Sequence, residues 1–178
     1  MAVFLMKHPF IPDKMFESIY DITPDFLISC GLRAVVLDID NTMVTYGMAK
    51  PTPEVLSWIE SLRAGGLSVA IASNNHRERV ELFNEEIGAF VTWESGKPFA
   101  KSVRMAASHF GVKEEEIAVI GDQIFTDIWC ARNAGSYAIL VVPLKYKENL
   151  FFRFKRMCEK PFIRAYKKKN AKSQGERS

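Results

Sequence analysis

The chain lacks several features that would assign it to a specialised class of protein. Its 178 residues contain no apolar run of about 18–20 residues, so we expect no membrane-spanning helix. Its three cysteines are widely spaced and form no Cys-x-x-Cys pair, which predicts reduced thiols in a cytoplasmic protein. The first ten residues have neither a basic stretch nor a small-residue cleavage site, so we expect no signal peptide.

Charge is distributed unevenly along the chain, although the net charge is only +3. Residues 145–178 hold 12 Lys or Arg and 3 Asp or Glu, whereas residues 1–144 hold 12 and 18. The basic segment also interleaves aromatic residues with Lys and Arg, among them Phe151, Phe152, Phe154, Phe162 and Tyr166. Three alternatives fit this composition: a helix packed on the core, a segment attracted to an anionic membrane surface, or a nucleic-acid-binding segment.

Short apolar runs alternate with helical patterns. The runs lie at 34–37, 67–72, 89–92, 117–120 and 137–142. Continuous apolarity is typical of strands buried on both faces of a parallel sheet. Helices are expected at about 53–64, 98–110 and 124–134, each followed by glycine. This alternation predicts a doubly wound α/β fold with helices on both faces of the sheet.

The predicted core therefore spans residues 34–144. Residues 1–33 precede it and could hold one or two short helices packed on the core, the second beginning at Pro24. The basic aromatic segment 145–178 follows, and we expect its polar end, residues 167–178, to be disordered.

Polar residues follow the predicted strands or precede the helices. They are Asp38, Asp40, Ser73, Asn74, Lys97, Asp122 and Asp127. Ligands of doubly wound sheets bind beyond the carboxyl ends of the strands. Carboxylates gathered there repel one another, and a cation with oxygen ligands, most plausibly Mg²⁺, would relieve that repulsion.

The order of these residues resembles that of the haloacid dehalogenase-like phosphatases. Asp38-Ile39-Asp40-Asn41-Thr42 is similar to the first motif of that superfamily, Asp-x-Asp-x-Thr. The resemblance implies that Asp38 is the nucleophile and a metal ligand, and that an aspartyl-phosphate forms on it. Asp40 would serve as general acid and base and bind the metal through its backbone carbonyl. Asp122 would complete the metal site with support from Asp127, although Asp127 could instead only begin a helix.

The same resemblance implies how phosphate is bound. The Ser73 hydroxyl and the Asn74 backbone N–H would hold phosphate oxygens, and Lys97 would offset their charge. Two alternatives stay open from the sequence, because Ser73 could cap the following helix and Lys101 lies close to Lys97. The spacing between the motifs leaves no room for a cap domain. We therefore expect an open site for a phosphate carried on a lipid, a protein, a nucleic-acid end or a bulky metabolite.

A narrower resemblance lies ahead of the first motif. Residues 18–24, Ser-Ile-Tyr-Asp-Ile-Thr-Pro, are similar to the lead-in of the YqeG-type phosphatases of subfamily IIIA. Relatives of that group are phosphatidylglycerophosphate phosphatases, which implies a phospholipid substrate and a cytoplasmic enzyme at the inner membrane surface. The alternative hypothesis is a module that binds RNA, the ribosome or a protein through its basic segment, with catalysis secondary or lost.

Overall fold

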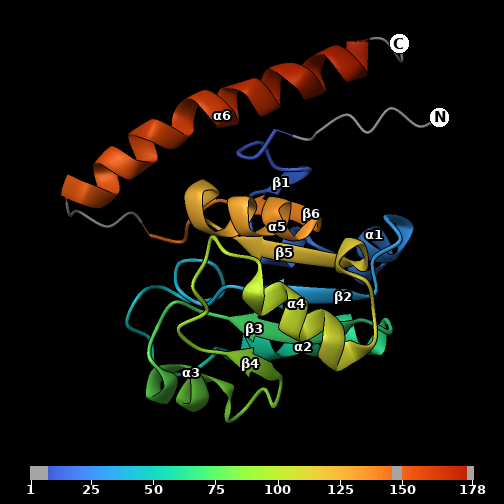
Figure 1. Cartoon of the computed structure of the whole chain (residues 1–178), viewed down its shortest axis with the longest axis vertical. Helices are drawn as coiled ribbons and strands as arrows, with labels where there is room; N and C mark the ends of the chain where they lie inside the picture. The colour runs from blue at the N-terminus through green and yellow to red at the C-terminus, as the bar shows by residue number, and fades with distance from the viewer. Residues whose placement is uncertain (1–7, 146–149, 176–178) are drawn as a thin grey trace.

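The fold is built on one parallel β-sheet. The structure, a computed structural model, describes residues 8–145 and 150–175. Six strands lie in the spatial order β1 (Lys14–Phe16), β6 (Tyr137–Val141), β5 (Ile117–Gly121), β2 (Ala34–Leu37), β3 (Ser68–Ala72) and β4 (Phe90–Thr92) (Figure 1). Every neighbouring pair is parallel, which confirms the predicted α/β class.

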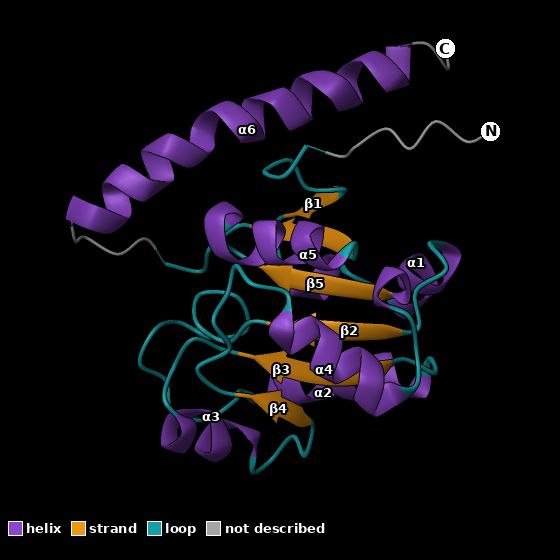
Figure 2. Ribbon diagram, in the orientation of Figure 1, coloured by secondary structure: helices purple, strands orange, loops and turns teal. Residues whose placement is uncertain are grey.

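Helices cover both faces of the sheet (Figure 2). One face packs against α1 (Pro24–Ser29), α2 (Pro53–Ala64) and α3 (Arg77–Asn84). The other packs against α4 (Lys101–Phe110) and α5 (Trp129–Ala134). Alternate residues of β2 enter the two cores, Val35 and Leu37 on one side and Ala34 and Val36 on the other. Burial on both faces explains why the strands read as continuous apolar runs.

The lead-in differs in part from the prediction. Pro24 begins α1 as expected, and the Thr23 hydroxyl accepts a hydrogen bond from the backbone N–H of Phe26. A short 3₁₀-helix, Ile19–Asp21, precedes it. Strand β1 was not predicted, because its three residues form no apolar run and pair with the sheet only through β6 at the edge.

Two helix starts are also displaced. The helix expected from Pro98 begins at Lys101. The helix expected over 124–134 consists of a π-helical turn, Ile124–Ile128, followed by α5. A further 3₁₀-helix, Glu114–Glu116, precedes β5. The π-helical turn matters for the functional site, because it carries Asp127.

Helix α6 (Leu150–Gly175) replaces the disorder that we predicted for residues 167–175, while 176–178 lie outside the described residues. Phe162 and Ile163 pack against the core on the α4–α5 side. Tyr166 is buried, and its hydroxyl accepts a 3.1 Å hydrogen bond from the backbone N–H of Met15. The contacts of Phe162, Ile163 and Tyr166 hold α6 on the domain. The side chains of Phe151 and Phe152 lie outside the described residues. In the described part of the chain, no helix has the length and apolar character needed to span a bilayer.

Candidate active site

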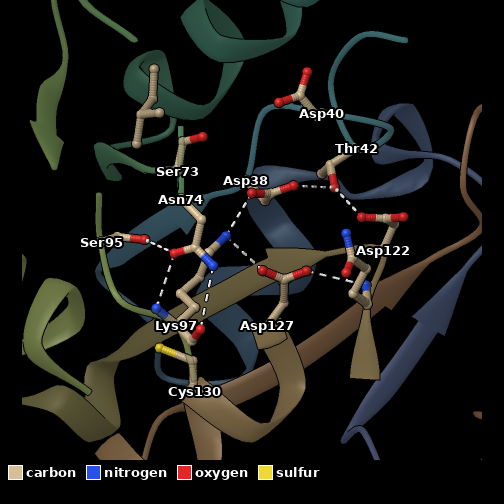
Figure 3. Close-up of polar contacts among 12 residues, drawn as sticks. Asp38, Asp40, Thr42, Ser73, Asn74, Ser95, Lys97, Asp122, Asp127 and Cys130 are labelled. Atoms are coloured by element: carbon tan, nitrogen blue, oxygen red, sulfur yellow. Dashed lines mark hydrogen bonds and ion pairs between the residues drawn. The ribbon is translucent and has the colours of Figure 1, made fainter. Parts of the chain in front are cut away.

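The polar residues singled out in the sequence gather at one edge of the sheet. Asp38, Ser73 and Asp122 directly follow β2, β3 and β5, whose carboxyl ends point the same way. Lys97 comes from the loop between β4 and α4, and Asp127 from the π-helical turn after β5. Figure 3 shows these side chains pointing toward one another. The strand order therefore brings together residues that are up to 89 positions apart.

Lys97 lies between two of the carboxylates. Its Nζ is 2.5 Å from Asp38 Oδ1 and 2.7 Å from Asp127 Oδ1 (Figure 3). Burial lowers the pKa of Lys97, but the charges of Asp127 and Asp38 outweigh burial and raise it above its ordinary value. Lys97 is therefore a permanent cation at the site. Lys101, the alternative from the sequence, is exposed on α4.

Two carboxyl groups at the site hold their protons more tightly than usual. Burial is the largest cause that raises the pKa of Asp38 to about 7, with Lys97 opposing and Asp127 and Asp122 adding to the rise. Burial likewise raises the pKa of Asp122 to about 6 against the opposing charge of Arg156. Ionised carboxylates in this small space are thus under-compensated by the protein alone.

Asp127 is held by its own turn and needs a glycine beside it. Its Oδ2 accepts a 3.1 Å hydrogen bond from the backbone N–H of Gln123. A Cβ atom at Gly121 would overlap the Asp127 side chain, so only glycine lets the carboxylate approach β5 this closely. The presence of glycine at position 121, directly before Asp122, is therefore explained by packing.

Thr42 lies between two acidic residues of the site, Asp38 after β2 and Asp122 after β5. Its hydroxyl lies 3.3 Å from Asp38 Oδ2 and 3.4 Å from Asp122 Oδ1 (Figure 3). A hydroxyl has one proton, so it donates to one carboxylate at a time. We assigned Thr42 no chemistry from the sequence, and its contacts here are with the two acids rather than with solvent-facing groups.

Asn74 fastens the Lys97 segment to the end of β3. Its Oδ1 accepts hydrogen bonds from the Lys97 backbone N–H at 3.0 Å and the Ser95 hydroxyl at 2.8 Å, and its Nδ2 donates to the Lys97 carbonyl at 3.3 Å. Ser73 is buried, and its hydroxyl accepts from the backbone N–H of Asn75 at 3.2 Å. Ser73 does not cap α3, whose N-cap is His76.

Asp40 stands apart from the cluster of Asp38, Asp122 and Asp127 (Figure 3). Its carboxylate accepts hydrogen bonds from Asn75 Nδ2 and, at 3.3 Å, from Arg79 Nη2. Nothing in the sequence connected Asn75 and Arg79 with it, since Arg79 reaches back from the first turn of α3. Asp40 and Asp38 nevertheless line the same cavity.

The acidic residues fit a divalent cation. Asp38, Asp122 and Asp127 each offer a carboxylate oxygen, and these oxygens lie within 4.8 Å of one another. Asn41 Oδ1 is buried and accepts no hydrogen bond from the residues that the structure describes, so it could receive one from a water molecule on the cation. An all-oxygen donor set suits Mg²⁺, Ca²⁺ or Mn²⁺ rather than a soft metal.

Helix α6 also contacts the site, which the sequence did not reveal. The Arg156 guanidinium donates to the Asp122 carboxylate and carbonyl, and its Nη1 is 2.9 Å from Glu159 Oε2. The buried Glu159 accepts a 2.9 Å hydrogen bond from the backbone N–H of Ile124. Arg156 is one of many cations in the segment, so composition alone could not distinguish it from solvated neighbours.

The site opens into a cavity of about 1050 Å³. Asp38, Asp40, Ser73 and Lys97 line its inner part, and basic residues of α6 line another side. No cap domain is present among the residues that the structure describes, as predicted, but the site is less open than expected. A single helix from the C-terminal segment bounds part of it.

Comparisons with known proteins agree with this geometry. The family model described as haloacid dehalogenase-like hydrolase matches residues 24–135. The chain is 34% identical over 165 residues to "Probable phosphatase YqeG" of Bacillus subtilis, covering 93% of this chain and 96% of the relative. It is 27% identical over 179 residues to phosphatidylglycerophosphate phosphatase 1 of Arabidopsis thaliana, covering 95% of this chain and 50% of the relative. The cobalt-bound deoxy-D-mannose-octulosonate 8-phosphate phosphatase of Haemophilus influenzae shares the fold, with a TM-score of 0.52 at 13% identity over 77% of this chain and 90% of that chain.

Proposed function

Because the chain belongs to the haloacid dehalogenase-like hydrolases and is a phosphatase of phosphate monoesters, we propose that Asp38 is its nucleophile and Mg²⁺ its cofactor. The observation that carries the proposal is the buried cluster of Asp38, Lys97, Asp122 and Asp127 at the carboxyl ends of β2 and β5. Lys97 and Arg156 carry less positive charge than Asp38, Asp122, Asp127 and Glu159 carry negative charge. A dication would offset this excess and make room for the charge of a bound phosphate.

The reaction proceeds in two displacements. An Asp38 carboxylate oxygen attacks phosphorus, the bond from phosphorus to the ester oxygen breaks, and Asp40 gives its proton to the leaving alkoxide. Asp40 then accepts a proton from water, whose oxygen attacks the phosphorus of the aspartyl-phosphate. The bond from phosphorus to Asp38 breaks, which releases inorganic phosphate and restores the carboxylate.

The other residues bind and orient. The Ser73 hydroxyl and the Asn74 backbone N–H hold phosphate oxygens, and Lys97 offsets charge between the phosphate and Asp38. Asp38 and Asp122 would hold Mg²⁺ together with the Asp40 carbonyl, and the ion would supply positive charge for the phosphate oxygens. Asp127 keeps Lys97 in place through its 2.7 Å ion pair.

We propose phosphatidylglycerophosphate as the substrate. The Arabidopsis relative, whose name states that activity, aligns with 95% of this chain. Helix α6 supports a lipid substrate, because Leu150, Phe154 and Met157 are 80%, 58% and 56% exposed and their spacing of four and three residues places them on one side. That side faces away from the buried Glu159.

Basic residues beside this apolar stripe match an anionic lipid surface. Arg153 and Lys160 are exposed on the same helix, and Met157 lies both in the stripe and at the cavity. Seating the stripe at the head-group level would bring a lipid phosphate toward Asp38. The protein would thus act in the cytoplasm, peripherally at the inner membrane surface.

The test is Mg²⁺-dependent phosphate release from phosphatidylglycerophosphate in mixed micelles, with Asp38→Asn as the blank. We expect rapid release by the wild type, none by the variant, and loss of release in EDTA. Turnover of a small generic phosphoester without turnover of the lipid would reject the substrate but keep the phosphatase. Lipid turnover by Asp38→Asn would reject the nucleophile.

A further inference from the structure

The cavity is larger than the transferred group requires. Its volume of about 1050 Å³ is at the upper end of sites for whole drug-sized ligands. The residues assigned to phosphoryl transfer lie in its inner part, whereas Arg153, Lys155, Arg156 and Lys160 line it from α6. A substrate that fills this space would contact both walls.

Charge pairing separates these cations into two groups. Arg156 pairs with Asp122 and Glu159, and Lys155 donates to Gln123. Arg153 and Lys160 are exposed, and neither forms an ion pair with a carboxylate among residues 8–145 and 150–175. Lys145, which lines the same cavity from the end of the core, is likewise unpaired within those ranges. Within the described parts of the chain, three cations at the cavity thus have no carboxylate partner.

The phosphate that is cleaved in the reaction does not account for these three cations. In the proposed reaction its charge is met by Lys97 and the bound metal ion, in the inner part of the cavity. Cations gathered on one wall of a cleft create a local positive potential that favours an anion. Arg153 adds a planar fork of donors that matches the oxygens of a phosphate group.

The wall is also fixed in place relative to the nucleophile. Glu159 is bonded to the backbone of Ile124, Tyr166 to that of Met15, and Arg156 to Asp122. Because α6 is attached on both sides of Lys160, this cation stands at a defined position beside the reacting phosphate. Arg153 precedes the anchored Arg156 by one helical turn. Pre-organised cations of this kind discriminate between ligands more sharply than mobile ones.

We propose that Arg153 and Lys160, assisted by Lys145, form a subsite for a second anionic group carried by the substrate itself. The inference rests on the proposed phosphatase function and deepens it. The substrate class is a phosphate monoester that also bears a phosphodiester or similar anion. These residues determine specificity and touch no reacting atom.

The experiment compares two soluble substrates, so that no membrane takes part. Glycerophosphoglycerophosphate carries a monoester and a diester phosphate, whereas glycerol 3-phosphate carries the monoester alone. The wild type with Mg²⁺ should prefer the first through a lower KM. Arg153→Gln with Lys160→Gln should reduce this preference, measured as the ratio of kcat/KM values, by about 10- to 100-fold, since each charged hydrogen bond lost weakens binding about tenfold.

Matched controls come from the same helix. Arg164 and Lys168 are exposed and do not line the cavity, so Arg164→Gln with Lys168→Gln removes the same charge at a distance. This pair should leave the preference as in the wild type. Binding of unreacted glycerophosphoglycerophosphate to Asp38→Asn, measured by calorimetry with and without the Arg153 and Lys160 substitutions, tests the subsite independently of turnover.

The outcomes are distinguishable. An equal loss on both soluble substrates would overturn the subsite, because the cations would then serve the reacting phosphate. An effect confined to lipid vesicles would also overturn it and assign the anion to neighbouring head groups. Turnover of neither substrate by the wild type would count against the proposed function, while tenfold weaker calorimetric binding after the two substitutions would still support the subsite.

Discussion

Replacing Asp38 should stabilise the metal-free protein, and the gain in the free energy of unfolding should depend on pH. Asp38 is buried, and burial raises its pKa from 3.8 to about 7. When a carboxyl has a higher pKa in the folded than in the unfolded protein, its contribution to the free energy of unfolding is complete below the unfolded-state pKa. That contribution is lost as pH rises through the folded-state pKa. The cost of burying Asp38 therefore builds up between about pH 4 and pH 7 and is complete at higher pH, and Asp38→Asn removes that cost.

The magnitude follows from the two pKa values. Each tenfold change in proton affinity corresponds to about 1.4 kcal/mol, so ionising Asp38 costs the wild type about 4 kcal/mol at pH 8. At pH 5 the same relation gives about 2 kcal/mol. The stability advantage of Asp38→Asn should thus widen between pH 5 and pH 8, by roughly 5–10 °C in Tm for a chain of this length.

The assay is urea and thermal unfolding of both proteins in EDTA at the two pH values. Glu78→Gln, which neutralises an exposed carboxylate on α3, is the control and should show no widening. Adding Mg²⁺ should stabilise the wild type and reverse much of the difference. An equal stability advantage of Asp38→Asn over the wild type at pH 5 and pH 8 would refute the reasoning. Lys97 alone would then compensate the ionised Asp38 carboxylate.

Four further substitutions test separate parts of the site and its support. Lys97→Met should lower turnover at least 100-fold and destabilise the fold by about 3 kcal/mol, because buried carboxylates lose their cation; normal phosphate release would contradict this. Asp122→Asn should abolish the Mg²⁺-induced stabilisation, which for the wild type is about 2.7 kcal/mol at one hundred times Kd; an unchanged thermal shift would place the metal elsewhere. Asn74→Ala should reduce kcat about tenfold, because three hydrogen bonds to the Lys97 segment are lost; a change confined to KM would argue against that positioning role. Tyr166→Phe should lower the unfolding free energy by about 1 kcal/mol, since the backbone N–H of Met15 loses its acceptor; an unchanged urea midpoint would mean that water replaces the hydroxyl.

The sequence by itself determined the fold class and the order of the polar motifs. Buried strands leave a local signal, because every residue between Ala34 and Leu37 must be apolar when both faces are covered. The cap of α2 was equally local, with Thr52 and Pro53 at the positions that a helix start prefers. Strand β1 left no such signal, since only its pairing with β6 makes its three residues a strand.

The arrangement of charge was decided by the tertiary structure. Which lysine reaches Asp38 depends on the loop after β4, and the sequence left Lys97 and Lys101 as alternatives. The contact between Arg156 and Asp122 joins residues 34 positions apart in segments that the sequence treated separately. Local patterns record whether a segment is buried, whereas the partner of a long charged side chain is set by how distant segments pack, and only the folded chain specifies that.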